Sequence, residues 1–177
     1  TGEGTTNLGK PLKGILHSMS PLKIVTGTIA PAGVRVSAEI ADGMIPVFMN
    51  PNRFDVFESA LNDGFEKAGG GKSLDNFFVT PFCAINLLDD EIAARQPARE
   101  NLALYIGGMG ARDKNFYNDY AKRLGHEGAA VEIQDHFLAG RRAEALASVP
   151  DELIDQVALT GPAGKITERL QDWKSAS

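Results

Sequence analysis

Cysteine and histidine are scarce in this chain of 177 residues. Cys83 is its single cysteine, so an internal disulfide is excluded, and this composition fits a protein of the reducing cytoplasm. The histidines follow no shared spacing and have no cysteine or acid pattern beside them; they are His17, His126 and His136. We therefore expect no metal site, and we interpret each histidine as a surface or packing residue.

A long hydrophobic run and an excess of positive charge are lacking as well. No apolar segment approaches the ~18 residues of a membrane span, and the chain does not open with a signal peptide. The net charge of −5 argues against nucleic acid or an anionic membrane as a partner. No paired carboxylates and no serine–histidine–aspartate arrangement stand out, so the catalytic residues stay unknown. These absences predict a soluble, acidic, cytoplasmic protein, and its start at Thr1 suits a processed or partial chain.

Strand and helix signals alternate in the first half of the chain. A short β-branched run at residues 23–27 predicts a strand. Pro31 then occupies the first helical position, where its missing N–H would be unpaired in any case, and Gly43 ends the helix. Met44–Met49 is a nearly continuous apolar run, which predicts a strand buried on both faces. This order is typical of a parallel sheet covered by helices.

The same pattern repeats once and then changes. A helix is predicted from Phe54 to the glycines at 69–71, and the apolar run Phe77–Ile85 predicts a third strand. From about 98 to 155 the apolar spacing indicates helices only, which is too long for an ordinary crossover and indicates an inserted helical subdomain. Val157–Thr160 predicts a last strand, and a final helix follows it. We therefore expect a single α/β domain over the whole chain, 1–177.

The sharpest candidate for a binding site is the turn Thr26–Pro31, between the first strand and the first helix. Free N–H groups of the first helical turn and the helix dipole favour an anion there. The alternative is an ordinary strand-to-helix turn, because no Walker or dinucleotide spacing is present. Thr160–Ala163 is interpreted as a plain helix start with Thr160 as its N-cap. The glycine run at 107–110 is interpreted as a hinge between helices rather than a phosphate cradle.

Other single residues are assigned by their position relative to the strands. Phe48, Met49 and Asn50 follow the second strand and are the residues we expect to face a substrate. Cys83, inside the third strand, is expected to be a small buried hydrophobe with an unreactive thiol. Trp173, on the last helix, is expected to be a packing residue.

Several segments, in order along nearly the whole chain, resemble one known family. They are Gly9–Lys13, the strand and turn up to Pro31, Ala38–Gly43, Gly70–Asp75, Leu104–Gly110, Lys114–Asn118, Pro150–Leu153 and Val157–Leu159. Together they resemble the luciferase-like monooxygenase superfamily, most closely its flavin- or deazaflavin-dependent oxidoreductases.

This resemblance implies a (β/α)₈ barrel with a helical insertion late in the barrel. The chain is similar to the C-terminal half of such a barrel, from the fifth strand onward. The N-terminal half, which carries the family's usual proton-transfer residues, would then be its partner. The resemblance also implies pairing with a second copy of the protein.

The function implied is hydride transfer between coenzyme F420 and a small organic substrate, with FMN as the alternative cofactor. A non-catalytic, ligand-binding barrel is the alternative from another functional class. In relatives, the turn that matches Gly27, Thr28, Ile29 and Ala30 gives backbone N–H groups to the cofactor phosphate. This chain differs by having Ile29-Ala30 where smaller residues, often glycine, precede the proline.

Overall fold

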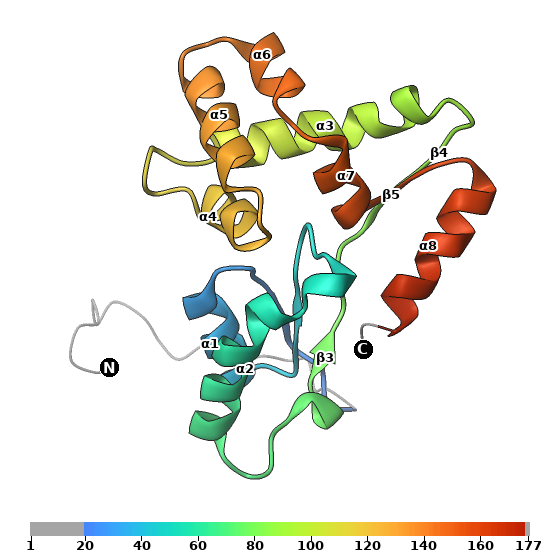
Figure 1. The fold of residues 1–177 in the computed structure, drawn as a ribbon. Coiled ribbons are helices and arrows are strands. Elements are labelled where there is room, and N and C mark those ends of the chain that lie inside the picture. The colour runs from blue at the N-terminus through green and yellow to red at the C-terminus, as the bar shows by residue number, and fades with distance from the viewer. Residues whose placement is uncertain (1–19, 176–177) are drawn as a thin grey trace, which may run out of the picture.

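Parallel strands alternate with helices in the first half of the chain, as Figure 1 shows. The computed structural model describes residues 20–175, so the Gly9–Lys13 segment and His17 lie outside the described residues. The first sheet has the order β1-β2-β3, and each neighbouring pair is parallel. Its strands are β1 (Val25–Gly27), β2 (Gly43–Ile45) and β3 (Phe78–Val79), and the helices that follow β1 and β2 are α1 (Pro31–Ile40) and α2 (Asp55–Ala68).

Two further strands form a separate, two-stranded sheet. β4 (Ala84–Leu87) pairs in parallel with β5 (Ala158–Gly161). An isolated parallel bridge between Val47 and Phe82 lies between the two ladders. The expected α/β architecture with parallel strands is therefore confirmed.

Helices fill the interval between β4 and β5. They are α3 (Glu91–Gly108), α4 (Phe116–Arg123), α5 (Glu127–Leu138), α6 (Arg142–Ala147) and α7 (Asp151–Val157). The predicted insertion at 98–155 lies within this helical region, which we define as residues 91–157. Its first residue, Ala98, falls inside α3, because Pro97 is accommodated there without ending the helix. The division of the chain into a barrel domain and an insertion stays a prediction.

The core lies between the strands, α1, α2 and the helical region. Its larger fully buried side chains come from all of these parts of the chain. They include Val34, Met44, Phe57, Leu61, Leu102, Ile133 and Ile154. No helix among residues 20–175 has the length and apolar character needed to cross a membrane.

Several expectations about local structure are wrong. Met44–Met49 does not form one strand buried on both faces, because β2 ends at Ile45, which is 37% exposed. Gly43 begins β2 and does not end the helix, because α1 ends at Ile40.

Residues 77–85 do not form one strand buried on both faces: β3 and β4 are separate, and Phe78, Phe82 and Ile85 are 50%, 66% and 63% exposed. Cys83 lies between the two strands and is only half-buried, although burial does raise the pKa of its thiol.

Two further corrections concern the glycine run at 107–110 and Thr160. Gly107 and Gly108 are the last residues of α3 and do not form a hinge. Both lie against the ring of Phe137 on α5, so a Cβ at either position would overlap that side chain. Thr160 is a buried residue of β5 and does not cap the last helix, since α8 (Ala163–Ser175) begins three residues later.

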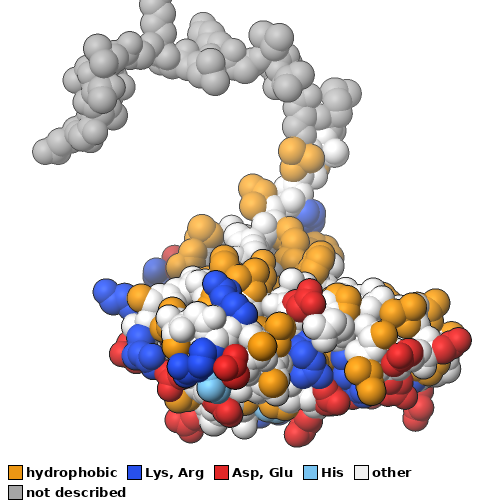
Figure 2. Space-filling model, turned by 90° about the horizontal axis from the view of Figure 1, so that it is seen from above, with side chains coloured by type: hydrophobic (Ala, Val, Ile, Leu, Met, Phe, Trp, Pro, Cys, Tyr) orange, Lys and Arg blue, Asp and Glu red, His pale blue; other side chains and the backbone are white. Residues whose placement is uncertain are grey.

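Apolar side chains are exposed along the strands and at the start of the described chain. Figure 2 shows hydrophobic side chains gathered around this start. Among them, Leu22, Ile24, Phe82, Ile85 and Leu87 are each more than 60% exposed, as are Ile40 and Ile92 on the helices. Among the described residues, β2 pairs with two strands, whereas β1, β3, β4 and β5 each pair with one. A sheet with open edges and an apolar face needs a partner surface.

The close packing of α1 on α2 is tested by Gly64→Ala. A Cβ at Gly64 would overlap the Arg35 carbonyl and the Ala38 methyl group, so we expect a loss of about 1–3 kcal/mol in the free energy of unfolding. Urea denaturation measures it. The control is Gly128→Ala on α5, where a Cβ meets no atom within 4 Å and the change should stabilise by about 0.4–1 kcal/mol. Equal effects of the two substitutions would contradict the packing.

The consequence of the exposed apolar side chains can be tested by expressing residues 1–177 alone. We expect this chain to self-associate, because leaving about ten large apolar side chains half exposed forfeits on the order of 10 kcal/mol. That is comparable with the whole stability of a typical domain. Size-exclusion chromatography and thermal melting measure the outcome. A monomer that unfolds in one sharp transition and binds coenzyme by itself would contradict the prediction.

Candidate functional site

The carboxyl ends of β1 and β2 lie beneath the helical region. Arg123 on α4 donates a hydrogen bond to the carbonyl of Ile29, just after β1, at 2.9 Å. Phe48, just after β2, contacts the rings of Tyr105 on α3 and Tyr117 on α4, with centroids 5.4 and 6.4 Å away. Ligands of parallel α/β proteins bind at this end of the strands, so this is where a functional site is expected.

The four predicted cofactor-binding residues form one continuous turn between β1 and α1. Gly27 ends β1, and Ala30 precedes Pro31 as the N-cap of α1. Ala30 provides no side-chain cap, and the first turn of α1 contains no acidic residue. The N–H groups at this helix start are therefore not neutralised by a carboxylate of the helix itself, and the positive end of the helix dipole is available to an anion.

The turn has open space beside Gly27, whereas the side chains of Thr28 and Ile29 are packed against the protein. A Cβ at Gly27 would meet no atom within 4 Å, so the turn is open there. The Thr28 hydroxyl lies so close to Gly33 that a Cβ at Gly33 would overlap it. Ile29 is 2% exposed and points into the core, so only its backbone can reach a ligand. The turn can thus present backbone N–H groups to an anion while its larger side chain holds it in place.

Arg123 belongs to this site although its sequence position gave no sign of it. Its guanidinium lies over the ring of Tyr120, 5.3 Å from the centroid, and donates through Nη2 to Ile29. Its Nη1 is buried and has no hydrogen-bond partner among the described residues. Burial lowers the pKa of Arg123, since it penalises the charged form. Ninety-four positions separate Arg123 from Ile29, and no local spacing encodes such a contact.

The predicted substrate residues Phe48, Met49 and Asn50 do not face one common space. Phe48 has a φ of 54°, a strained backbone for a bulky residue, and lines a cavity of about 90 Å³ together with Tyr105. Met49 is 3% exposed and borders a separate cavity that Trp173 also lines. Asn50 is 4% exposed, and its amide oxygen accepts the N–H of Asn52 at 2.9 Å.

These contacts give the three residues different tasks. Asn50 caps the short helix η1 (Pro51–Arg53), so its side chain is occupied by the backbone. Met49 packs in the core. Phe48 alone of the three is at once partly exposed and part of the aromatic group beneath the helical region.

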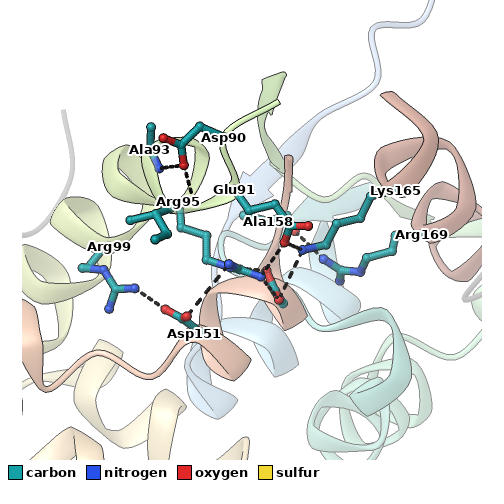
Figure 3. Close-up of polar contacts among 11 residues, drawn as sticks. Asp90, Glu91, Ala93, Arg95, Arg99, Asp151, Ala158, Lys165 and Arg169 are labelled. Atoms are coloured by element: carbon teal, nitrogen blue, oxygen red, sulfur yellow. Dashed lines mark hydrogen bonds and ion pairs between the residues drawn. The ribbon is translucent and has the colours of Figure 1, made fainter. Parts of the chain in front are cut away.

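A cluster of charged residues lies where α3, α7 and α8 meet, as Figure 3 shows. Arg95 on α3 donates to both oxygens of Asp155, at 3.0 and 2.8 Å, and to Glu91 at 3.1 Å. Lys165 on α8 binds Glu91 at 2.6 Å. Arg99 pairs with Asp151. Because opposite charges are matched throughout, this cluster holds three helices together rather than offering a free charge to a ligand.

The part of the chain that the structure describes contains no group of three or more metal-ligating side chains. His126 instead contacts Gln156 at 2.9 Å, and His136 lies 3.0 Å from the Arg141 guanidinium, which donates to it. Both serve local packing.

Comparison with known proteins identifies relatives over almost the whole chain. Residues 3–177 match the family model described as luciferase-like monooxygenase. A putative coenzyme F420-dependent oxidoreductase of Mycobacterium tuberculosis is 36% identical over 177 residues, which cover 99% of this chain and 51% of the relative. A 5,10-methylenetetrahydromethanopterin reductase of Archaeoglobus fulgidus is 25% identical over 157 residues, covering 88% of this chain and 46% of the relative.

Solved structures show the same fold. The coenzyme F420-dependent tetrahydromethanopterin reductase of Methanopyrus kandleri aligns with a TM-score of 0.67 at 20% identity, covering 88% of this chain and 43% of that one. An F420-dependent secondary alcohol dehydrogenase, in complex with an F420-acetone adduct, aligns with a TM-score of 0.54 at 13% identity, covering 90% and 42%. The chain thus has the fold of about half of a luciferase-like TIM barrel, and it spans about half the length of the curated relatives it matches.

The ion pairs of the charged cluster predict that the free energy of unfolding depends on pH. Burial alone would raise the pKa of Asp155, but the hydrogen bonds from Arg95 and the charges of Lys165 and Arg95 outweigh it, so the pKa is lowered from its ordinary 3.8. The ionised carboxylate therefore stabilises the fold above about pH 4, and this stabilisation is lost as the pH falls through the lower folded value. We expect Asp155→Asn to reduce the free energy of unfolding at pH 7, and this deficit to shrink below pH 4.

Urea denaturation at a series of pH values measures this difference. The control is Asp119→Asn, because Asp119 is 60% exposed and lies 3.8 Å from Lys122, so its removal should change stability by less than about 0.5 kcal/mol. A deficit of Asp155→Asn that stays constant from pH 7 to pH 3 would contradict the assignment.

Proposed function

The chain belongs to the luciferase-like monooxygenase family, and we propose that its protein is an oxidoreductase that transfers a hydride between coenzyme F420 and a small organic substrate. The relatives named above support this proposal, because each of the four carries a name that states an oxidoreductase and three of those names state F420. When bound, the coenzyme supplies the atom that gives or receives the hydride. The residues of this chain have the task of binding and orienting it.

The observation that carries the proposal is the open turn before α1. The backbone N–H groups of Gly27, Thr28, Ile29 and Ala30 are the donors we assign to the coenzyme phosphate. The turn suits this group for two reasons: the space at Gly27 is free, and the helix start has neither a side-chain cap nor an acidic residue. A phosphate held there is fixed relative to β1, so the coenzyme is oriented before reaction.

The assignment of the substrate side rests on Phe48 and the aromatic rings above it. Phe48, Tyr105 and Tyr117 form an apolar surface at the same end of the strands as the turn. Burial raises the pKa of Tyr117, as does the neighbouring Tyr105, so its phenol stays uncharged at neutral pH. We propose that this surface excludes water and contacts the organic substrate, and that Met49 and Asn50 hold Phe48 in place from behind.

Two other expectations stay predictions: a cytoplasmic location and pairing with a second copy of the protein. The catalytic residues stay unassigned, because no described side chain at this site has the contacts of an acid or base pair.

The proposal is tested by titrating the full-length protein with F420 and, separately, with FMN while following fluorescence. We expect F420 to bind and Gly27→Val to weaken its binding at least about tenfold, because the new side chain fills the space assigned to the phosphate. The matched control is Gly164→Val at the start of α8, where a Cβ also meets no atom within 4 Å. This control should bind F420 like the natural protein.

Each outcome has a defined meaning. Binding of FMN alone would overturn the choice of coenzyme. Binding of neither compound would overturn the proposal and favour a non-catalytic barrel, an alternative suggested by Ala30, whose Cβ narrows the approach to the turn. Binding of F420 without hydride transfer to any organic substrate would overturn the enzymatic part of the proposal.

A further inference from the structure

The helical region contacts the turn of residues 27–30 through the partly buried Arg123. Nη2 of Arg123 donates to the Ile29 carbonyl at 2.9 Å, so α4 is tied to the backbone of the turn itself. Arg123 has no carboxylate partner among the ion pairs of residues 20–175. A partly buried cation without a counter-ion is costly to keep, and such a charge indicates a role other than stability.

The geometry of a peptide group explains what this hydrogen bond does. The C=O of Ile29 and the N–H of Ala30 belong to one planar trans unit, so they point in opposite directions. Arg123 fixes the direction of the carbonyl. The next carbonyl, that of Ala30, is held by the N–H of Val34 at 2.9 Å. The N–H of Ala30 therefore points away from Arg123, and no hydrogen-bond acceptor for it is found among residues 20–175.

The positive charge of Arg123 also favours an anion at the turn. Nη1 of Arg123 is buried and has no protein partner among the described residues, and the guanidinium lies over the ring of Tyr120. A positive charge behind the turn adds to the positive end of α1 and favours an anion on the open side. The hydrogen bond from Arg123 thus orients the N–H of Ala30, and the positive charge of Arg123 increases the attraction of the turn for an anion.

Arg53, on η1, is a suitable residue for comparison because it also contacts the C-terminal end of α4. Its guanidinium donates to the carbonyls of Leu124 and Arg123, at 3.3 and 3.2 Å, so it also anchors α4. Unlike Arg123, it is paired with a carboxylate, Asp55, at 2.8 Å, and it makes no hydrogen bond to the turn. Arg53 therefore holds the helix without contacting the backbone that faces the phosphate.

From these observations we infer that Arg123 is a positioning residue for the coenzyme phosphate: it orients the Ile29–Ala30 peptide so that the Ala30 N–H faces the phosphate. The inference rests on the proposed function for the identity of the anion. It assigns to the helical region a direct part in coenzyme binding, although that region is far from the turn in sequence.

The test compares Arg123→Met, Arg123→Lys and Arg53→Met in the full-length protein. We expect Arg123→Met to weaken F420 binding about tenfold, the effect of one hydrogen bond to a charged group, with the rate at saturating F420 unchanged. Arg123→Lys keeps a charge and a donor and should recover part of the affinity. Arg53→Met should lower the melting temperature and leave the dissociation constant of F420 within about twofold.

A second measurement does not depend on F420. In the coenzyme-free protein, nuclear magnetic resonance should show Arg123→Met shifting the carbonyl carbon of Ile29 and the amide nitrogen of Ala30. Inorganic phosphate, used as the probe, should shift the Ala30 amide in the natural protein and in Arg53→Met, but not in Arg123→Met.

The two proposals fail in different ways. If F420 does not bind but phosphate shifts the Ala30 amide only while Arg123 is present, the coenzyme is wrong and the positioning role stands. If Arg123→Met leaves both F420 affinity and the phosphate response unchanged, the positioning role is overturned. Equal losses of affinity in Arg123→Met and Arg53→Met would also overturn it, because they would show that both residues act only by holding α4.

Discussion

Parallel pairing of the strands is the constraint on which the rest of this structure depends. Each described strand pair runs in the same direction, so the carboxyl ends of β1 and β2 meet at one edge. The turn that starts α1 and the strained Phe48 are brought together for this reason, although about twenty residues separate them. The helix start that we propose to bind an anion and the apolar surface around Phe48 therefore lie at the same edge, and a coenzyme with a phosphate and a reactive ring would need both.

The helical region contacts this edge of the strands. Its inner surface supplies Tyr105 and Tyr117 to Phe48, and it supplies Arg123 to the carbonyl of Ile29. The region is itself anchored by the paired charges around Arg95 and Asp155, which bind α3, α7 and α8 to one another. Paired charges join α3, α7 and α8, whereas Arg123, which lies beside the turn, makes no ion pair among the described residues.

The exposed apolar strands fit the relation between this chain and its relatives. A barrel closes only when each strand has two neighbours, and among the described residues only β2 pairs with two strands. Leu22, Phe82 and Ile85 would be buried on closure and are open to solvent here. Open strand edges and an exposed apolar face are what half of a barrel would be expected to show, and this chain spans about half the length of the relatives it matches.

Much of this fold follows from local rules, and for that reason the sequence predicts it well. Pro31 at the start of α1, the glycines that follow α2 and Asp90 at the start of α3 act on their own segments, so each boundary is visible in a few adjacent residues. The helix start at the turn of residues 26–31 could be located for the same reason, since a helix start after a strand presents its N–H groups whatever surrounds it. Its binding of the coenzyme phosphate stays a prediction.

The remaining features depend on contacts between distant residues. Met49 and Asn50 are adjacent to Phe48 in the chain, yet their side chains are buried by the core and by a helix cap while Phe48 is turned toward α3 and α4. Gly107 and Gly108 stay helical because Phe137 packs on them, and glycine spacing alone indicates a loop. Arg123 meets Ile29 across ninety-four positions. The spacing of neighbouring residues does not predict this contact, because the packing of the helices on the sheet determines which surfaces touch.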